Sequence, residues 1–587
     1  MEHRQTVGFL VSGIMDDFIV QLCRGVIEEA NKYDTNVVVI PIKYINREMR
    51  YLPDVYEYQY QTSTHYLSAE NLDVLIVAAD CIGCQTTLKN LENFMKKIKE
   101  KGIPIILAAS KMDGYSGVIF DNRSGILEGL NYLIEELGIT NICMLKSMDS
   151  NADVNERSEA FKQVLKDHGI KIKSSTIINA PVYGDCIEES KKLLDLNPNV
   201  EAVFCANDEI AMNFYGVMRD RGLTPGKDIK VMGFDNSACA NMVIPSLTTV
   251  DANPVHLGER VFRMARMAME GWEVGKMSLP TRFILRDSFG SLLDSQDAEE
   301  KIFDKNYLDE YFRRVFFKFE EYENQEEYEF LIMFKSLISI IIDYVNDQQY
   351  SPERVRFLKN KVDEFFKTDA LNYTSVDVLI AYVNSLKNAA INRFENAERK
   401  CQALETYSTI LEKVVKTLSD RITQEESKYD APISTLKVMV EDTLNLDIVD
   451  DEYYTNILVN LARFGVKNAF LYVYEKPILH ENKRPFRAPD KLLLKTIMTS
   501  GKIKPIPPED QVIYIDEMYN NKFIPDRKFN RVVMPLYFQN TVYGCLLYDL
   551  TDITYKNGEF LAKYYSITVR IIDKIRKLAE AKQIKLP

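Results

Sequence analysis

Polar side chains stand directly after two short apolar runs in the first half of the chain. Residues 200–205 (VEAVFC) are followed by Asn207 and Asp208, and residues 229–234 (IKVMGF) are followed by Asp235. An asparagine side chain donates and accepts hydrogen bonds, whereas a carboxylate only accepts them. Asn207 and Asp235 therefore suit a ligand that presents hydroxyl or amino groups. Asp208 is explained equally well as an acid in the first turn of a helix.

The same pattern recurs at other apolar runs. A polar loop over residues 12–18 (SGIMDDF) follows the run 7–11, and an acid follows the run 118–120. Ligands of open parallel sheets bind outside the carboxyl ends of the strands, so side chains at these points can face one cleft. Each residue alone is also explained as a cap or a turn residue. The candidate ligand-binding residues are Ser12, Asp16, Asp17, Phe18, Asp121, Arg157, Asn207 and Asp235.

Short apolar runs alternate with helical periods from residue 7 to about residue 286. Strands that alternate with helices indicate βαβ units and a parallel sheet. Such runs number about ten, more than one mononucleotide-binding half holds, so we expect an α/β domain of two lobes. The expected strands are 7–11, 37–40, 74–78, 105–108, 118–120, 142–145, 176–178, 202–205 and 229–233.

The pattern changes after residue 290. Residues 292–384 show long amphipathic helical periods rich in Phe and Tyr. From residue 387 to 425, two sets of residues recur every seven positions, offset by three, which predicts a coiled-coil seam. One long helix packed within its own domain explains the same spacing. The two sets are Phe394, Cys401, Ser408, Val415 and Ile422, and Ala390, Ala397, Leu404, Leu411 and Leu418.

Residues after 432 predict a smaller α+β domain. Residues 452–475 indicate a helix followed by a strand. The apolar runs 531–538 and 542–550 are separated by a short polar joint at 539–541, which is typical of a β-hairpin. A final helix is expected over 557–581. The stripe of that helix expected to pack is Tyr564, Ile571 and Leu578.

Length and composition limit the classes of protein that fit. A chain of 587 residues exceeds one hydrophobic core, and its net charge of −13 argues against a surface that binds nucleic acid. The sequence contains no apolar run long enough for a transmembrane helix and no signal peptide, so we expect a cytoplasmic protein without a membrane contact. Nine scattered cysteines fit reduced thiols. The expected domains are 1–290, 291–385, 386–430 and 431–587.

Metal, redox and phosphate chemistry have weak support. Cys81 and Cys84 form a Cys-x-x-Cys pair, but a zinc site needs four ligands and no second half is evident. The five histidines are isolated, and no glycine-rich phosphate loop is present. We therefore expect no metal, no cofactor and no enzymatic activity. A glycosidase acid pair at Asp16 and Asp17 is a remote alternative.

The residues from about 6 to 286 resemble the ligand-binding core of the lactose-repressor family, which is related to periplasmic sugar-binding proteins. The resemblance lies in FCANDEIA, GFDN, SLTTVDANP and GERVFRMA, in that order, with VIFDNRSG and NERSEAF upstream. It implies two lobes that close on a sugar or nucleoside. Contacts would come from residues 12–18, Asp121, Arg157, Asn207 and Asp235. Phe18 would stack on a ring, and the planar fork of Arg157 would bind vicinal hydroxyls or a carboxylate.

The rest of the chain is similar to sensor proteins in which helices and a GAF-like domain follow such a binding domain. Many of these end in a GGDEF diguanylate cyclase, but this sequence contains no Gly-Gly pair. Only six residues precede the first expected strand, too few for the helix-turn-helix of the repressors, so we expect no direct contact with nucleic acid. We expect a homodimeric sensor that relays closure through the coiled coil to an output partner. The alternatives are the sensory half of a diguanylate cyclase, or a transcription regulator whose output domain is absent from this chain.

Overall fold

The structure is a computed structural model. It describes residues 4–45, 55–84, 86–147, 152–181, 185–290, 303–305, 308–316, 325–346, 352–365, 373–374, 376–394, 396–401, 404–405, 407–408, 410–413, 415–417, 419 and 452–581.

The chain divides into two compact units that interleave along the sequence. The expected binding domain passes from one unit to the other after residues 121, 252 and 280. This division agrees with two lobes linked by several chain crossings. Unit 1 comprises Met1–Asp121, Asn253–Pro280 and Tyr429–Pro587, and unit 2 comprises Asn122–Ala252 and Thr281–Lys428.

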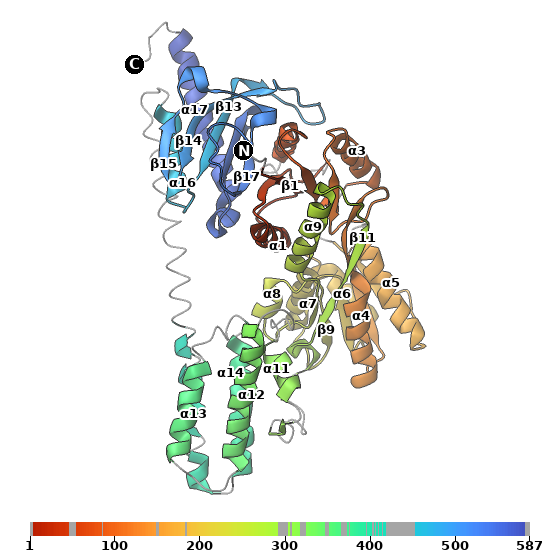
Figure 1. Ribbon diagram of the computed structural model, residues 1–587. Coiled ribbons are helices and arrows are strands. Elements are labelled where there is room, and N and C mark those ends of the chain that lie inside the picture. Colours follow the sequence, from red (N-terminus) through yellow and green to blue (C-terminus); the bar gives the residue numbers. More distant parts are fainter. Residues whose placement is uncertain are drawn as a thin grey trace. The chain divides into compact units, whose positions relative to one another are not determined.

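Unit 1 is built on one twelve-stranded sheet in the order β11-β5-β4-β3-β1-β2-β17-β18-β13-β14-β15, with β16 paired to β14. The red strands of the first 121 residues and the blue strands of the C-terminal residues belong to this one sheet (Figure 1). The strands are β1 (Thr6–Val11), β2 (Asn36–Pro41), β3 (Val74–Val77), β4 (Ile105–Ala108), β5 (Ser116–Asp121), β11 (Lys276–Pro280), β13 (Ala469–Leu479), β14 (Lys491–Thr499), β15 (Lys502–Pro505), β16 (Val512–Tyr514), β17 (Asn530–Phe538) and β18 (Thr541–Asp549).

Two helices of unit 1 approach each other closely because both carry glycine at the contact. A Cβ on Gly25 of α1 would lie 1.9 Å from the carbonyl oxygen of Val255, and a Cβ on Gly258 of α9 would lie 2.4 Å from that of Leu22. Larger residues would push the two backbones apart. The helices of unit 1 are α1 (Asp17–Lys32), α2 (Ala79–Ile82), α3 (Leu88–Lys99), α9 (Pro254–Met269), α16 (Glu452–Ala462) and α17 (Asp552–Ala581), with 3-10 turns η2 (Glu57–Tyr66), η7 (Pro508–Asp510) and η8 (Ile515–Glu517).

Unit 2 contains a four-stranded parallel sheet in the order β7-β6-β8-β9. Each expected strand of the first half overlaps a strand of the structure, which confirms the α/β alternation. The elements are β6 (Ile142–Ser147), β7 (Ile177–Ala180), β8 (Ala202–Cys205), β9 (Lys230–Met232), β10 (Thr249–Asp251), β12 (Arg282–Ile284), α4 (Asn122–Asn131), η3 (Tyr132–Glu136), α5 (Ala152–Asp167), α6 (Ile187–Leu196), α7 (Asp208–Asp220), α8 (Ala238–Met242) and η4 (Asp287–Phe289).

Unit 2 continues into a helical region whose core is rich in aromatic rings. The domain boundary expected at residue 385 falls inside one of its helices, α14, because the seven-residue spacing begins within that helix. The boundaries near 290 and 430 adjoin residues outside the described ranges and stay predictions. The helices are α11 (Leu308–Val315), α12 (Gln325–Asn346), α13 (Pro352–Phe365) and α14 (Val376–Arg393).

The expected coiled-coil seam is divided between buried and exposed positions. Ala390 is buried and Leu411 packs against the helical core, whereas the side chains of Leu404 and Val415 are 42% and 52% exposed. A dimer seam needs its apolar positions on one free face. Packing within the helical region explains Ala390 and Leu411 without a partner chain. Leu418 and Ile422 lie outside the described residues.

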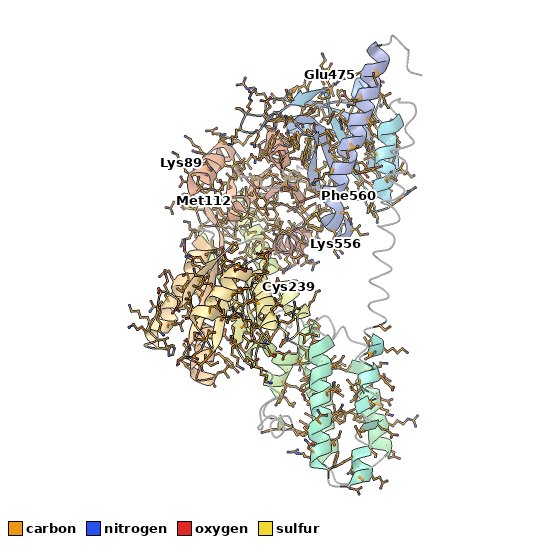
Figure 2. All side chains as sticks on the ribbon, turned by 180° about the vertical axis from the view of Figure 1, so that it is seen from behind. Lys89, Met112, Cys239, Glu475, Lys556 and Phe560 are labelled. Atoms are coloured by element: carbon orange, nitrogen blue, oxygen red, sulfur yellow. The ribbon has the colours of Figure 1, made fainter. Side chains whose placement is uncertain are left out.

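The C-terminal part of unit 1 confirms the predicted hairpin of β17 and β18 and the final helix. The predicted stripe of that helix was one position off. Leu578 is 58% exposed and Tyr564 is half-buried, and Phe560 also lies on the exposed side of α17 (Figure 2). Both faces of the helix carry apolar residues at helical spacing, so periodicity alone could not choose between them. The stripe that packs is Leu561, Tyr565, Val569 and Ile572.

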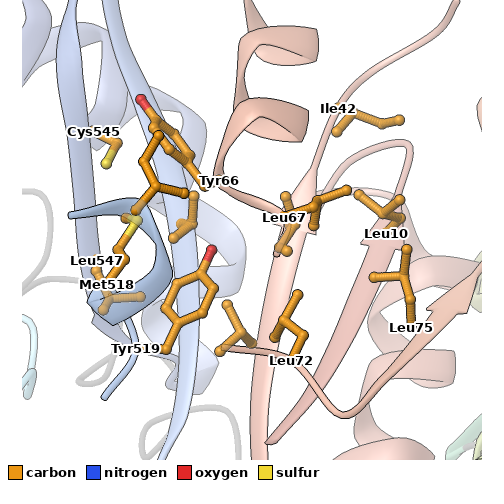
Figure 3. Packing of buried hydrophobic residues seen from close by; sticks show 14 of the residues in the cluster. Leu10, Ile42, Tyr66, Leu67, Leu72, Leu75, Met518, Tyr519, Cys545 and Leu547 are labelled. Carbon is orange, nitrogen blue, oxygen red and sulfur yellow. The ribbon is translucent and has the colours of Figure 1, made fainter. Parts of the chain in front are cut away.

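Strand β17 joins the two parts of the unit 1 sheet. It runs parallel to β2 and pairs Asn530 with Val37 and Val532 with Val39. Side chains from both parts form one buried cluster, with Tyr66 and Leu72 from the first part and Met518 and Tyr519 from the second (Figure 3). The C-terminal residues are therefore part of the same folded body as the first 121 residues, a relationship that the domain expectation did not include.

Candidate functional site

Arg157 is the centre of the polar group in unit 2. Its Nε lies 3.2 Å from the side-chain oxygen of Asn122, its Nη1 lies 2.8 Å from the carbonyl oxygen of Ala206, and its Nη2 lies 3.3 Å from Oδ1 of Asp235. The guanidinium also stacks on the ring of Phe234, 3.5 Å from its centroid. These contacts hold the planar fork in one orientation, as binding of a polar ligand requires.

The structure thus brings two of the candidate residues together, Arg157 on α5 and Asp235 after β9. Asp235 follows β9, and Ala206 follows β8, so both lie at the carboxyl ends of neighbouring parallel strands. The side chain of Asp235 is 41% exposed and that of Arg157 is 13% exposed. The carboxylate can therefore accept a hydrogen bond from an incoming hydroxyl group while the arginine holds its other side.

Asp235 lies in a backbone turn that other buried residues hold in place. Asp235 and Asn236 have positive φ angles of 103° and 49°, which residues other than glycine adopt rarely. Arg286 donates from Nη2 to the side-chain oxygen of Asn236 at 2.6 Å and from Nη1 to the carbonyl oxygen of Leu247 at 2.8 Å. Burial lowers the pKa of Arg286 to about 10. Arg286 is a positioning residue that sequence reasoning missed.

Asp208 has a structural role. Its carboxylate accepts hydrogen bonds from the backbone and the hydroxyl group of Ser237, at 2.7 and 2.9 Å, and from the hydroxyl group of Thr249 at 2.6 Å. Burial, with a further contribution from Asp235, raises the pKa of Asp208 to about 7. Asp208 lies in the first turn of α7, one of the positions that the sequence allowed, and its contacts favour a structural role.

Asn207 is the N-cap of α7. Its side-chain oxygen accepts a hydrogen bond from the backbone nitrogen of Ile210 at 2.9 Å, which satisfies one of the free N–H groups of the helix end. Asn207 is half-buried, and its amide nitrogen remains a candidate donor to a ligand. The sequence alternatives of cap and ligand contact are therefore compatible at this residue.

Asn122 was not among the predicted site residues. It is fully buried, its amide nitrogen donates to Asp153 at 2.8 Å and to Glu156 at 3.2 Å, and its oxygen accepts from Arg157. Its position directly after the candidate Asp121 was the one signal in the sequence that could have identified it.

The predicted residues of unit 1 lie around the loop between β1 and α1. Ser12 is buried, and Asp16 is the N-cap of α1, with Oδ1 3.2 Å from the backbone nitrogen of Ile19. Asp17 is an exposed acid in the first turn of that helix. The structure therefore gives both acids a helix-capping or first-turn position, which suits neither as one of a glycosidase pair.

Phe18 and Asp121 complete the unit 1 candidates. The ring of Phe18 meets the ring of Phe120 edge-on, with centroids 6.1 Å apart, and remains partly exposed. Asp121 is the last residue of β5 and is half-buried. An aromatic ring beside a strand-end carboxylate is a suitable surface for a sugar or nucleoside.

Among the described residues, no group of three or more His, Cys, Asp or Glu side chains is placed to hold a metal ion. Cys81 and Cys84 are half-buried thiols without a disulfide. No described helix is long and apolar enough to cross a membrane.

Known proteins are similar to the first half of the chain. Residues 131–289 match the model of the periplasmic binding protein-like domain. The chain is 24% identical over 290 residues to catabolite control protein A of Priestia megaterium, a match that covers 48% of this chain and 81% of the relative. It is also 24% identical to the ribose import binding protein RbsB of Escherichia coli (strain K12) over 46% of this chain and 87% of that protein.

Solved structures are similar over the same half of the chain. The complex of the transcriptional regulator CelR with cellobiose covers 49% of this chain and 86% of its own, with 21% identity and a TM-score of 0.40. The relatives are regulators and binding proteins and not enzymes, in agreement with the expectation of no enzymatic activity. Several are helix-turn-helix regulators, so they give no support to the expectation that this chain avoids nucleic acid. Residues 131–289 thus match a periplasmic binding protein-like domain, and the first half of the chain is similar to regulators and binding proteins.

Proposed function

We propose that the protein is a regulatory sensor that binds a small polar ligand, a sugar or a nucleoside. The observation that carries the proposal is the pair of Arg157, on α5, with Asp235, which directly follows the parallel strand β9. Within unit 1, Phe18 and Asp121 are separate candidates that offer a ring and a carboxylate. The first compounds to test are ribose, which the name of the relative RbsB specifies, and cellobiose, which is present in the CelR complex.

Regulation of transcription is the output that the relatives favour. Catabolite control protein A and several helix-turn-helix regulators match over almost the whole ligand-binding half. The C-terminal part of unit 1, with its six antiparallel strands and flanking helices, is proposed to be GAF-like and to serve the output. Relay through a coiled coil has less support, because Ala390 and Leu411 already pack within the helical region.

A thermal-shift screen of the full chain tests the proposal. A ligand at one hundred times its dissociation constant stabilises the folded domain by about 2.7 kcal/mol. For a domain of this size, that corresponds to a rise in melting temperature of about 5 °C or more. The panel contains D-ribose, cellobiose, other sugars and nucleosides. A hit that Asp235→Ala abolishes, and that Asp220→Ala at the exposed end of α7 retains, supports the proposal.

A further inference from the structure

The ligand loop of unit 1 packs directly on the C-terminal helix α17. A Cβ added to Gly558 would lie 2.5 Å from Cδ1 of Ile14, and one added to Gly13 would lie 3.2 Å from Oε1 of Glu559. Gly13 and Ile14 lie inside the candidate loop 12–18, between Ser12 and Asp16. The two segments are more than 540 residues apart in the chain, yet no side chain larger than hydrogen fits at either glycine without movement.

An ion pair with little exposure to solvent lies at the same contact between the loop and α17. Nζ of Lys43 lies 2.5 Å from Oε1 of Glu559 and 3.7 Å from Oε1 of Glu57, and the three side chains are 11–12% exposed. Lys43 follows β2, and its backbone has a positive φ of 56°, an uncommon conformation for a residue other than glycine. A charge pair removed from water is sensitive to small displacements, because each partner loses compensation when the other moves.

Helix α17 is fixed at its start by hydrogen bonds and further along by buried side chains. Thr551 and Thr554 exchange hydrogen bonds at the start of the helix, with each hydroxyl group accepting from the other residue's backbone nitrogen, at 2.7 and 3.2 Å. Further along the helix, the side chains of Leu561 and Tyr565 are fully buried. A displacement at Gly558 is therefore passed to a packed element and not absorbed by a loose end.

We propose that helix α17 is coupled to the ligand loop, residues 12–18, and regulates its position. A change in the position of residues 12–18 on ligand binding acts on Gly558 and Glu559 directly, inside unit 1, and so reaches the C-terminal domain without passing through residues 291–430. Conversely, the state of the C-terminal domain sets the position of the loop, because coupling between two sites is reciprocal. The inference rests on the proposed function for the role of the loop in ligand binding.

Hydrogen exchange of the full chain without ligand tests the coupling. In Gly558→Ala the new methyl group must displace Ile14, so backbone exchange in peptides of residues 9–18 should accelerate about tenfold, equivalent to about 1.4 kcal/mol. Gly216→Ala is the matched control, because Gly216 also lies within a helix, α7, but a Cβ there meets nothing within 4 Å. That control should leave the loop unchanged.

Two further variants keep the test decisive if Gly558→Ala folds poorly. Glu559→Gln preserves shape and leaves Lys43 paired with Glu57, and it should accelerate exchange in the loop, whereas Asp573→Asn, which alters a surface pair with Lys577 on the same helix, should not. Ile14→Ala should accelerate exchange in residues 552–562, the reciprocal effect.

Unchanged hydrogen exchange in the loop would contradict the coupling. Folded Gly558→Ala and Glu559→Gln proteins with wild-type exchange in residues 9–18 would overturn the inference. Because no ligand is present, a failed ligand screen removes the proposed function without affecting this result, and unchanged exchange removes the coupling without affecting ligand binding.

Discussion

Arg157 and Asp235, which are 78 residues apart in the chain, meet with Nη2 3.3 Å from Oδ1 in unit 2. The pair combines a rigid donor fork with a carboxylate that keeps 41% of its side chain exposed. Such a pair can bind a diol, since the arginine donates to one oxygen and the carboxylate accepts from a hydroxyl group. The first prediction follows from the geometry of the arginine.

Arg157→Lys keeps the charge but loses the fork and the stacking on Phe234. A single ammonium group cannot reach Asn122, Ala206 and Asp235 together, so ligand affinity should fall at least about tenfold. Stability should fall by only about 1 kcal/mol. Affinity is measured by calorimetric titration and stability by urea unfolding. Arg219→Lys, at an exposed position of α7, serves as control, and equal affinities for both variants would argue against a role for the fork.

The buried carboxyl group of Asp208 predicts a pH dependence of stability. Its folded pKa is raised to about 7, whereas an unfolded aspartate titrates near 4. The folded state therefore holds the proton more tightly, and this contribution to stability is fully present below about pH 4 and is lost as pH rises to about 7. In Asp208→Asn this decline should disappear. Urea unfolding between pH 4 and 8 measures it, and parallel profiles for the two proteins would contradict the assignment.

The junction between the two parts of unit 1 predicts a contrast between neighbouring glutamines. Gln59 is fully buried and bonds the carbonyl oxygens of His480 and Gln539 at 3.0 Å, and its own oxygen lies 2.8 Å from Nδ1 of His480. Gln59→Ala leaves these groups without partners and should cost about 2–4 kcal/mol. Gln61→Ala, which loses one bond to Tyr44, should cost about 1 kcal/mol or less.

Chemical unfolding monitored by hydrogen exchange in residues 478–481 and 538–541 distinguishes these variants. Equal protection of those segments in Gln59→Ala and Gln61→Ala would show that the C-terminal residues fold independently of the first 121.

Two leucines of the seven-residue spacing separate a dimer seam from packing within the helical region. Leu411 packs against the helical core, whereas Leu404 is 42% exposed. With packing inside the chain, Leu411→Asp should lower stability by several kcal/mol, on the order of 2–5. Leu404→Asp should change it by less than about 0.5 kcal/mol. A coiled-coil dimer instead predicts that both variants dissociate the protein in sedimentation experiments.

The sequence predicted the local elements of this protein well. Apolar runs bounded by glycine and polar residues identified the four strands of the unit 2 sheet and most strands of the unit 1 sheet, but not β11, β14 and β15. The polar joint at 539–541 identified the hairpin of β17 and β18. These features depend on periodicity and on chain neighbours, which a sequence contains. Both Arg157 and Asp235 were among the candidate residues, but their contact joins helix α5 to the end of β9 and did not follow from the sequence.

Long-range choices could not be predicted in the same way. The edge of β2 is equally able to pair with any strand of suitable length, and nothing near Val37 specifies Asn530. Arg286 and Asn122 act through residues that folding brings to them, so their types alone gave no signal. The packed face of α17 was misassigned because Tyr564 and Tyr565 lie on opposite apolar stripes of one helix.

Calorimetric titration of the strongest stabilising compound from the screen, into the wild-type chain and into Asp235→Asn, tests the central claim most directly. Asparagine keeps the size of the side chain but replaces one acceptor oxygen with a donor, so the turn persists while a ligand hydroxyl group loses its partner. We predict saturable binding to the wild-type chain and an affinity reduced at least about tenfold in Asp235→Asn. Binding of equal affinity to both proteins would contradict the assignment of Asp235 and Arg157 as the ligand site.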